Sequence, residues 1–273
     1  MTSSETTSET TFQALLARFL TDPARLLAAR ENPDAFAQRE SLAPEDVRRL
    51  LAMRPAGLLT TSWVAMHKTR EQIRCLYPAT ITAASSLPEA GPLLEYGPAG
   101  GRLDRPEEAA AVGRGLRELA AQLNSPVGTR RAALLDLIRF ESLWYEAKAA
   151  LPSGPRTADR PATGPRLRPG SVLAGFGCEV VKAHRLTLEA GELVDMVTEP
   201  TAYVVAAGTD DRVSTVRLPP SAHDLLAACD GSVPVSVLSA RFGHPIGHIE
   251  RLLTQLARKG IVVLPDAAGR RTA

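Results

Sequence analysis

The chain has 273 residues, 44% of them hydrophobic and 23% charged, which is the composition of a globular protein with a buried core. Only 4% are aromatic, which argues against a stacking surface for single-stranded nucleic acid. The 32 Lys and Arg nearly balance the 30 Asp and Glu, and a net charge of +2 does not indicate an anionic membrane or nucleic acid as partner. No segment has the roughly 18 consecutive apolar residues of a membrane span, so we expect no membrane association and a cytoplasmic location.

Residues 12–150 are predicted to form an all-α domain, preceded by a disordered tail over 1–11 that is rich in Ser, Thr and Glu. Phe12, Leu15, Leu16 and Phe19 recur at the spacing of an apolar helix stripe. Further helices are expected after Pro44 and over 63–76, 107–123 and 130–151.

A proline-rich segment separates this half from the rest of the chain. Residues 151–170 contain five prolines, three glycines and four arginines against one aspartate. Because proline lacks a backbone donor and blocks helix formation, we expect a semi-extended linker.

The apolar pattern changes after the linker, and an α+β fold class follows. Strands are predicted over 178–184, 202–206 and 212–218, where β-branched residues are frequent. Helices are expected over about 220–229, 234–242 and 245–259, and then a short strand over 261–264. The order βββααα predicts a winged-helix-like domain over 171–265, with a disordered tail over 266–273.

The sequence contains no recognisable catalytic motif. It has neither a nucleophile elbow nor the HExxH metalloprotease motif, and its three widely spaced cysteines indicate neither a disulfide framework nor a thiol zinc site. His244 and His248 are four residues apart, but Pro245 and Gly247 between them disfavour a metal site. We therefore predict no catalytic residue and no metal ligand.

A winged helix raises the possibility of DNA binding, so the charge of this half is informative. Residues 171–273 hold ten Lys and Arg against eleven Asp and Glu, and Arg251 is the single cation in the first two turns of the expected third helix. DNA affinity rests on several phosphate contacts from Lys and Arg, so nucleic acid is disfavoured and a groove for a peptide is favoured. A DNA-binding transcription regulator with an N-terminal helical sensor domain remains the alternative.

Residues 202–231 resemble the peptide-binding chaperone of pyrroloquinoline quinone biosynthesis. In that family a strand, a turn and a second strand are followed by a helix with a recurring residue pattern. The positions that match this helix pattern are Ser221-Ala222, Leu225-Leu226 and Cys229-Asp230-Gly231. The resemblance implies a recognition element for the leader segment of a ribosomally synthesised and post-translationally modified peptide.

The helical half is similar to partner proteins of multinuclear non-heme iron oxidases that modify such peptides. The similarity lies in Phe19-Leu-Thr-Asp-Pro23, Asn32-Pro-Asp-Ala-Phe36 and Leu42-Ala-Pro-Glu-Asp46. It implies an accessory subunit rather than an enzyme, with a precursor peptide and the oxidase as partners and with iron only in the oxidase. In that case Phe140, Trp144 and Tyr145 are candidates for the surface that faces the enzyme, and the alternative is that they are simply helix core.

The strand over 212–218 is expected at a sheet edge, where a leader peptide could add a further strand. Ile246 and Ile249 are expected to line a groove with Val213 and Thr215 opposite, whereas Leu253 could instead pack in the core. A proline at Val216 is expected to remove a strand donor. The predicted peptide-binding residues are Arg212, Val213, Ser214, Thr215, Val216, Arg217, Ile246, Ile249 and Leu253.

Overall fold

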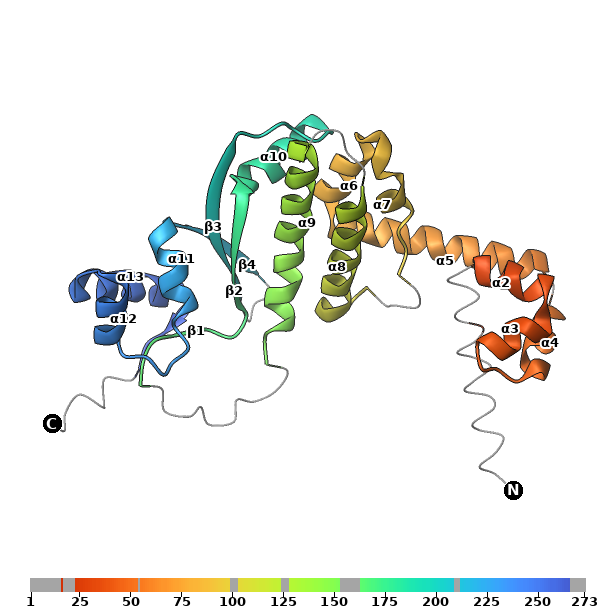
Figure 1. The fold of residues 1–273 in the computed structure, drawn as a ribbon, viewed down its shortest axis with the longest axis horizontal. Helices are drawn as coiled ribbons and strands as arrows, with labels where there is room; N and C mark the ends of the chain where they lie inside the picture. The colour runs from red at the N-terminus through yellow and green to blue at the C-terminus, as the bar shows by residue number, and fades with distance from the viewer. Residues whose placement is uncertain are drawn as a thin grey trace, which may run out of the picture. The chain divides into compact units, whose positions relative to one another are not determined.

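The computed structural model describes residues 16, 23–53, 55–98, 103–123, 128–152, 163–208 and 212–265. It shows a mixed α+β protein that is mainly helical, with small antiparallel sheets (Figure 1). The described residues form two compact units. One contains the residues up to Leu76 together with Pro92–Leu103, and the other contains Tyr77–Gly91 together with the residues from Asp104 onward.

The first unit is helical, as predicted for this half of the chain. Most of its helices begin with a proline, a residue that suits the first turn because its missing N–H would have no partner there. Asn32 caps one of them by accepting a hydrogen bond from the Ala35 N–H at 3.0 Å. The helices are α2 (Pro23–Glu31), α3 (Pro33–Arg39), α4 (Pro44–Leu51) and α5 (Pro55–Leu76), and α7 (Gly91–Glu95) reaches the unit boundary.

The core of the first unit lies between α2, α3 and α4, and contains Leu26, Phe36, Val47 and Leu50. The helix predicted over 63–76 is the second part of the longer α5. Of the helix predicted from Phe12, Leu16 is described and is helical, and the rest lies outside the described residues, as do the tails over 1–11 and 266–273.

The second unit contains a sheet with helices on both faces. Its sheet has the order β2 (Ser171–Cys178), β3 (Thr198–Ala207) and β4 (Val213–Leu218), all antiparallel. The long helix α9 (Gly128–Ala149) runs along the sheet and beside α8 (Pro106–Gln122) (Figure 1). The Phe140 ring of α9 contacts the Phe176 ring of β2, which in turn contacts the Tyr203 ring of β3. These contacts hold α9 against this face of the sheet. The other helices on this side of the unit are α6 (Pro78–Ser85), the 3-10 turn η1 (Pro88–Ala90) and α10 (Val180–Ala190).

The opposite face of the sheet packs against three short helices. They are α11 (Pro220–Ala227), α12 (Val235–Phe242) and α13 (Ile246–Arg258), close to the predicted ranges. Their core with the sheet includes Val204, Leu218, Leu225, Leu238 and Leu253. A two-stranded ribbon of β1 (Arg166–Leu167) and β5 (Val262–Val263) completes the unit.

The strand predicted over 178–184 is wrong, because β2 ends at Cys178 and α10 begins at Val180. Consecutive valines produce the appearance of a strand in this segment. The residues that α10 buries are Val180, Ala183 and Thr187, which have helical spacing. This stripe packs α10 against α6 and α9, so tertiary packing outweighs the β propensity of the valines.

The proline-rich segment is partly built into the second unit. Residues 153–162 lie outside the described residues, whereas β1 within the predicted linker pairs with β5. The Gly164 N–H donates to the Gly231 carbonyl at 3.0 Å, and the Arg168 N–H donates to the Ile261 carbonyl at 2.8 Å. The compact units thus divide the chain differently from the predicted segments 12–150 and 171–265, because α9 covers one face of the sheet and α6 and α8 pack against α9.

Gly113 allows α8 and α9 to approach closely, and its substitution gives a stability prediction. A Cβ at this position would overlap the Ser142 hydroxyl and lie 2.5 Å from the Tyr77 hydroxyl. We expect Gly113→Ala to lower the free energy of unfolding by about 1–3 kcal/mol, as overpacking a tight core does. Urea denaturation measures this, with Gly247→Ala as control because nothing lies within 4 Å of the added methyl group there. Equal stability of the two variants would contradict the prediction.

Candidate functional site

Strand β4 has one edge that no strand covers in the described part of the chain, since it pairs with β3 alone. The Gly208 N–H donates to the Arg212 carbonyl at 2.7 Å, and the register pairs Ala206 with Ser214 and Val204 with Val216. Because hydrogen-bonded and outward-facing residues alternate along an antiparallel strand, Ser214 and Val216 direct their main chains toward β3. The N–H and C=O groups of Val213, Thr215 and Arg217 therefore point away from the sheet, as strand addition requires.

The two faces of β4 differ from the predicted arrangement. Residues directly opposite each other in an antiparallel pair share a face, so Val216 lies with Val204 on the side of α11–α13. Val213 and Thr215 lie on the side of α9, together with Ala207 and Val205. The predicted groove with Val213 and Thr215 opposite Ile249 is therefore wrong, because the register places them on opposite faces of the sheet.

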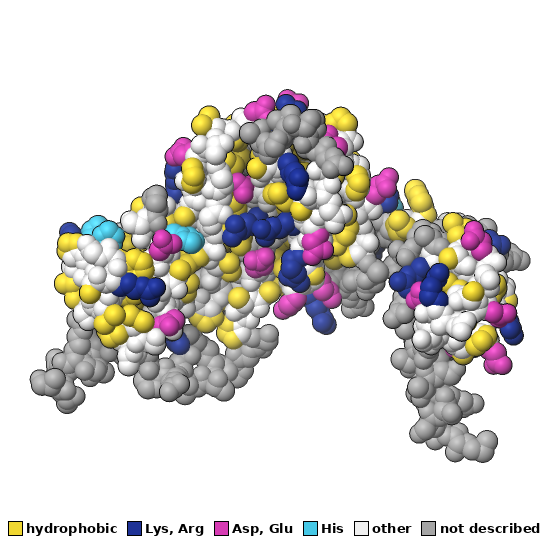
Figure 2. All heavy atoms as spheres, viewed as in Figure 1, with side chains coloured by type: hydrophobic (Ala, Val, Ile, Leu, Met, Phe, Trp, Pro, Cys, Tyr) yellow, Lys and Arg dark blue, Asp and Glu magenta, His cyan; other side chains and the backbone are white. Residues whose placement is uncertain are grey.

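A hollow of about 370 Å³ lies between α11 and α13. Pro219, which directly follows β4, is one of its lining residues, and histidine side chains reach the surface in this part of the molecule (Figure 2). Apolar side chains form its floor, and polar and basic side chains form its rim. The lining residues are Pro219, Ser221, Ala222, Leu225, His244, His248, Ile249, Arg251, Leu252 and Gln255.

The three residues predicted on the third helix have different environments. Ile246 is 47% exposed and does not line this hollow, whereas Ile249 is 1% exposed and forms part of its floor. Leu253 is also 1% exposed and lies in the core. Truncating a buried isoleucine costs about 2–5 kcal/mol, so Ile249→Ala would test stability as much as binding.

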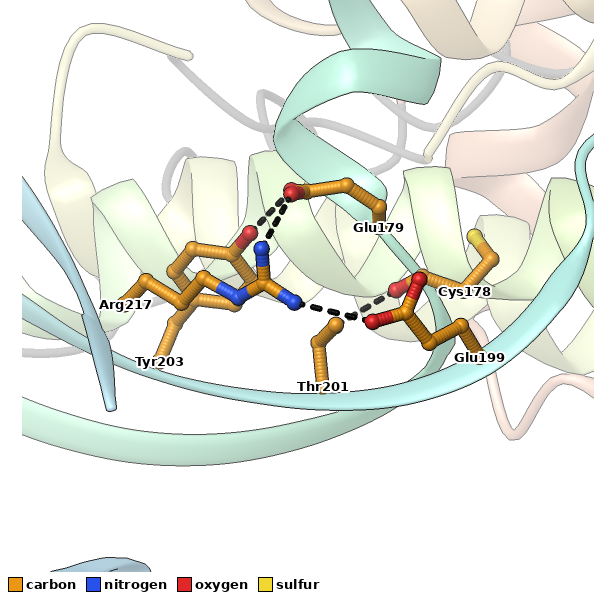
Figure 3. A network of polar contacts seen from close by, with 6 residues as sticks. All are labelled: Cys178, Glu179, Glu199, Thr201, Tyr203 and Arg217. Carbon is orange, nitrogen blue, oxygen red and sulfur yellow. Dashed lines mark hydrogen bonds and ion pairs between the residues drawn. The ribbon is translucent and has the colours of Figure 1, made fainter. Parts of the chain in front are cut away.

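A polar network ties the end of β4 to the start of α10 (Figure 3). The Arg217 guanidinium donates to Glu179 Oε2 and to Glu199 Oε1, both at 3.1 Å. The Tyr203 hydroxyl also donates to Glu179. Burial, and then the hydrogen bond to Glu179, raises the pKa of Tyr203 well above its usual range, so this hydroxyl remains a donor at neutral pH. The Arg217 guanidinium is therefore already paired with two carboxylates of the same chain.

A second hollow, of about 390 Å³, adjoins this network. It is lined by Glu199, Pro200, Thr201, Ala202, Arg217, Leu218 and Pro219. Pro219 lines both hollows, so both reach this residue. A peptide that runs along the outer edge of β4 toward Pro219 would pass Arg217, whose side chain is already paired, before it reaches the hollow between α11 and α13.

Sequence reasoning did not identify Glu179 or Glu199 as neighbours of Arg217. Their separations of 38 and 18 residues produce no local pattern. The predicted strand over 178–184 also placed Glu179 within a strand, whereas it is the residue that precedes α10.

The aromatic residues considered for a partner surface pack inside the second unit. Phe140 is 3% exposed and contacts the rings of Trp144, Phe176 and His184. Trp144 and Tyr145 are half-buried, and Tyr145 packs against Tyr77. Phe140 is therefore too buried to be part of a surface that faces a partner.

The described residues contain no group of three His, Cys, Asp or Glu that could hold a metal ion. His244 and His248 lie side by side, with ring centroids 6.0 Å apart. Burial raises the pKa of the Cys178 and Cys229 thiols to about 11, which keeps both protonated at neutral pH and unsuited to nucleophilic attack. Of the helices described, none has the length and apolar character needed to cross a bilayer.

Comparison with known proteins adds no family to these observations. No model of a protein family matches the chain, and no similar sequence is found among curated proteins.

Proposed function

We propose that this chain is a non-catalytic accessory subunit that binds the leader of a ribosomally synthesised precursor peptide and presents it to a multinuclear non-heme iron oxidase. The observation that carries the proposal is the uncovered edge of β4, with the main chains of Val213, Thr215 and Arg217 directed outward. Added strands gain affinity from main-chain hydrogen bonds and specificity from nearby side-chain pockets. The hollow between α11 and α13, which Pro219 helps to line, can supply such a pocket.

The winged-helix-like arrangement is part of this proposal. The order β3, β4, α11, α12 and α13 follows the strand, turn, strand and helix pattern of the peptide chaperone that the sequence resembles. Strand β2 takes the place of the first strand, although α10 intervenes before β3. In this reading the iron belongs to the oxidase, and the chain itself contributes recognition.

A DNA-binding regulator is the weaker alternative. The exposed start of α13 offers Arg251 as its one Lys or Arg among the first two turns, whereas DNA binding requires several phosphate contacts. An electrophoretic shift at physiological salt tests this alternative directly.

The proposal is tested by co-expression of the full chain with an iron oxidase and a short precursor peptide encoded beside its gene. Sedimentation velocity at micromolar concentration is expected to show a stable heteromer that contains the chain and the oxidase. Addition of the precursor peptide is expected to shift its sedimentation further. Independent sedimentation of all three components would contradict the proposed function.

A further inference from the structure

We infer that the hollow between α11 and α13 selects one feature of the bound peptide, an aliphatic side chain next to a carboxylate. This inference rests on the proposed peptide binding and adds the chemistry of the segment that is recognised. It concerns the part of the peptide that continues from the edge of β4 past Pro219, the residue that lines both hollows.

The floor of the hollow is suited to an aliphatic group. Ala222 and Leu225 of α11 and Ile249 of α13 are buried there, and Leu252 is half-buried. A volume of about 370 Å³ is at the small end of the range for ligand pockets. One branched aliphatic side chain can cover this floor and gain the free energy of apolar burial.

Several hydrogen-bond donors on the rim of the hollow have no acceptor among the described residues. Arg251 Nε donates to the Gly247 carbonyl at 3.1 Å, which orients the side chain and leaves its terminal nitrogens without a partner among the described residues. The rings of His244 and His248 contact each other, and neither ring hydrogen-bonds to a described residue. Within the described part of the chain, no Asp or Glu lines this hollow. A guanidinium group binds a carboxylate with two parallel hydrogen bonds, so Arg251 favours Asp or Glu in the occupant.

The second hollow, which Arg217 lines, is less suited than the hollow at Arg251 to a carboxylate of the peptide. The Arg217 side chain there already donates to both Glu179 and Glu199. These two carboxylates against one guanidinium leave that end of β4 with negative charge, which repels an acidic residue. Charge complementarity therefore places the acidic residue of the peptide beside Arg251.

The experiment selects a phage-displayed library of random twelve-residue peptides on the immobilised full chain. We expect the selected peptides to place Asp or Glu within two residues of Leu, Ile or Val. Arg251→Glu is expected to reverse the selection toward Lys and Arg and to bind the wild-type peptides at least ten-fold more weakly. Arg258→Glu is the matched control, because it makes the same charge change on an exposed residue of α13 outside the hollow.

Thr215→Pro distinguishes the inference from the proposed function. Selected peptides that require the Thr215 N–H but show no acidic residue, or that bind Arg251→Glu as well as wild type, would overturn the inference and leave strand addition standing. Acidic peptides that bind equally to Thr215→Pro would overturn strand addition at β4. A library that yields no specific peptide would overturn both.

Discussion

Replacing Thr215 with proline is expected to weaken peptide binding at least ten-fold while the protein remains folded. The Thr215 N–H points away from β3, so proline removes a donor that an added strand would use and leaves the internal β3–β4 hydrogen bonds in place. One lost hydrogen bond is worth about 0.5–1.5 kcal/mol, and the ring also blocks close approach of the peptide main chain. Calorimetry with a selected peptide measures the change in affinity.

Two control variants separate the main chain from the side chain at this edge. Thr215→Ala retains the N–H and is expected to bind nearly as wild type. Val216→Pro removes an N–H that faces β3 and is expected to destabilise the sheet itself, visible as a lower melting temperature by circular dichroism. Unchanged affinity of folded Thr215→Pro would show that the peptide does not pair with β4.

The structure thereby corrects the expectation that proline at Val216 tests binding. The sequence alternates Val213 and Thr215 with Ser214 and Val216, and both sets are partly apolar. A pattern that is apolar on both sides does not reveal which side faces the neighbouring strand or which helix covers it. Edge position could be predicted from chain order, whereas face and main-chain direction required the register with β3.

Local signals account for the elements that were predicted correctly. The turn residues between β3 and β4 and the proline before α11 mark the ends of these elements in the sequence, and the structure confirms strands and helices close to the predicted ranges. The segment after Cys178 has no such signal. Its helix is defined by contacts with α6 and α9, which are distant in sequence.

Glu141 illustrates a feature that sequence patterns do not reveal. This carboxylate of α9 is fully buried, with an exposed fraction of 0%. It accepts hydrogen bonds from the N–H groups of Ala79 and Thr80, at 2.9 and 3.0 Å, and so caps the start of α6. His184 Nε2 of α10 lies 3.1 Å from the same carboxylate. Three helices are thus joined at one side chain.

Glu141→Ala is expected to lower the free energy of unfolding by about 3–5 kcal/mol. The substitution leaves two buried N–H groups and one partly buried imidazole without their acceptor, and it removes a negative charge from a helix N-terminus. Glu141→Gln is expected to lose part of this amount, because its amide can accept through only one atom. Urea denaturation measures the loss, and Glu118→Ala, an exposed position on α8, is the control that should remain close to wild type.

The same substitution links stability to the edge of β4. Helix α10 carries His184 at its centre, and Glu179, which precedes its first residue, holds Arg217 and Tyr203. Loss of the Glu141 contact should therefore loosen α10 and weaken peptide binding as well as stability. A loss below about 1 kcal/mol with unchanged affinity would show that Glu141 does not hold these helices together, and that the network at Arg217 is maintained by the sheet alone.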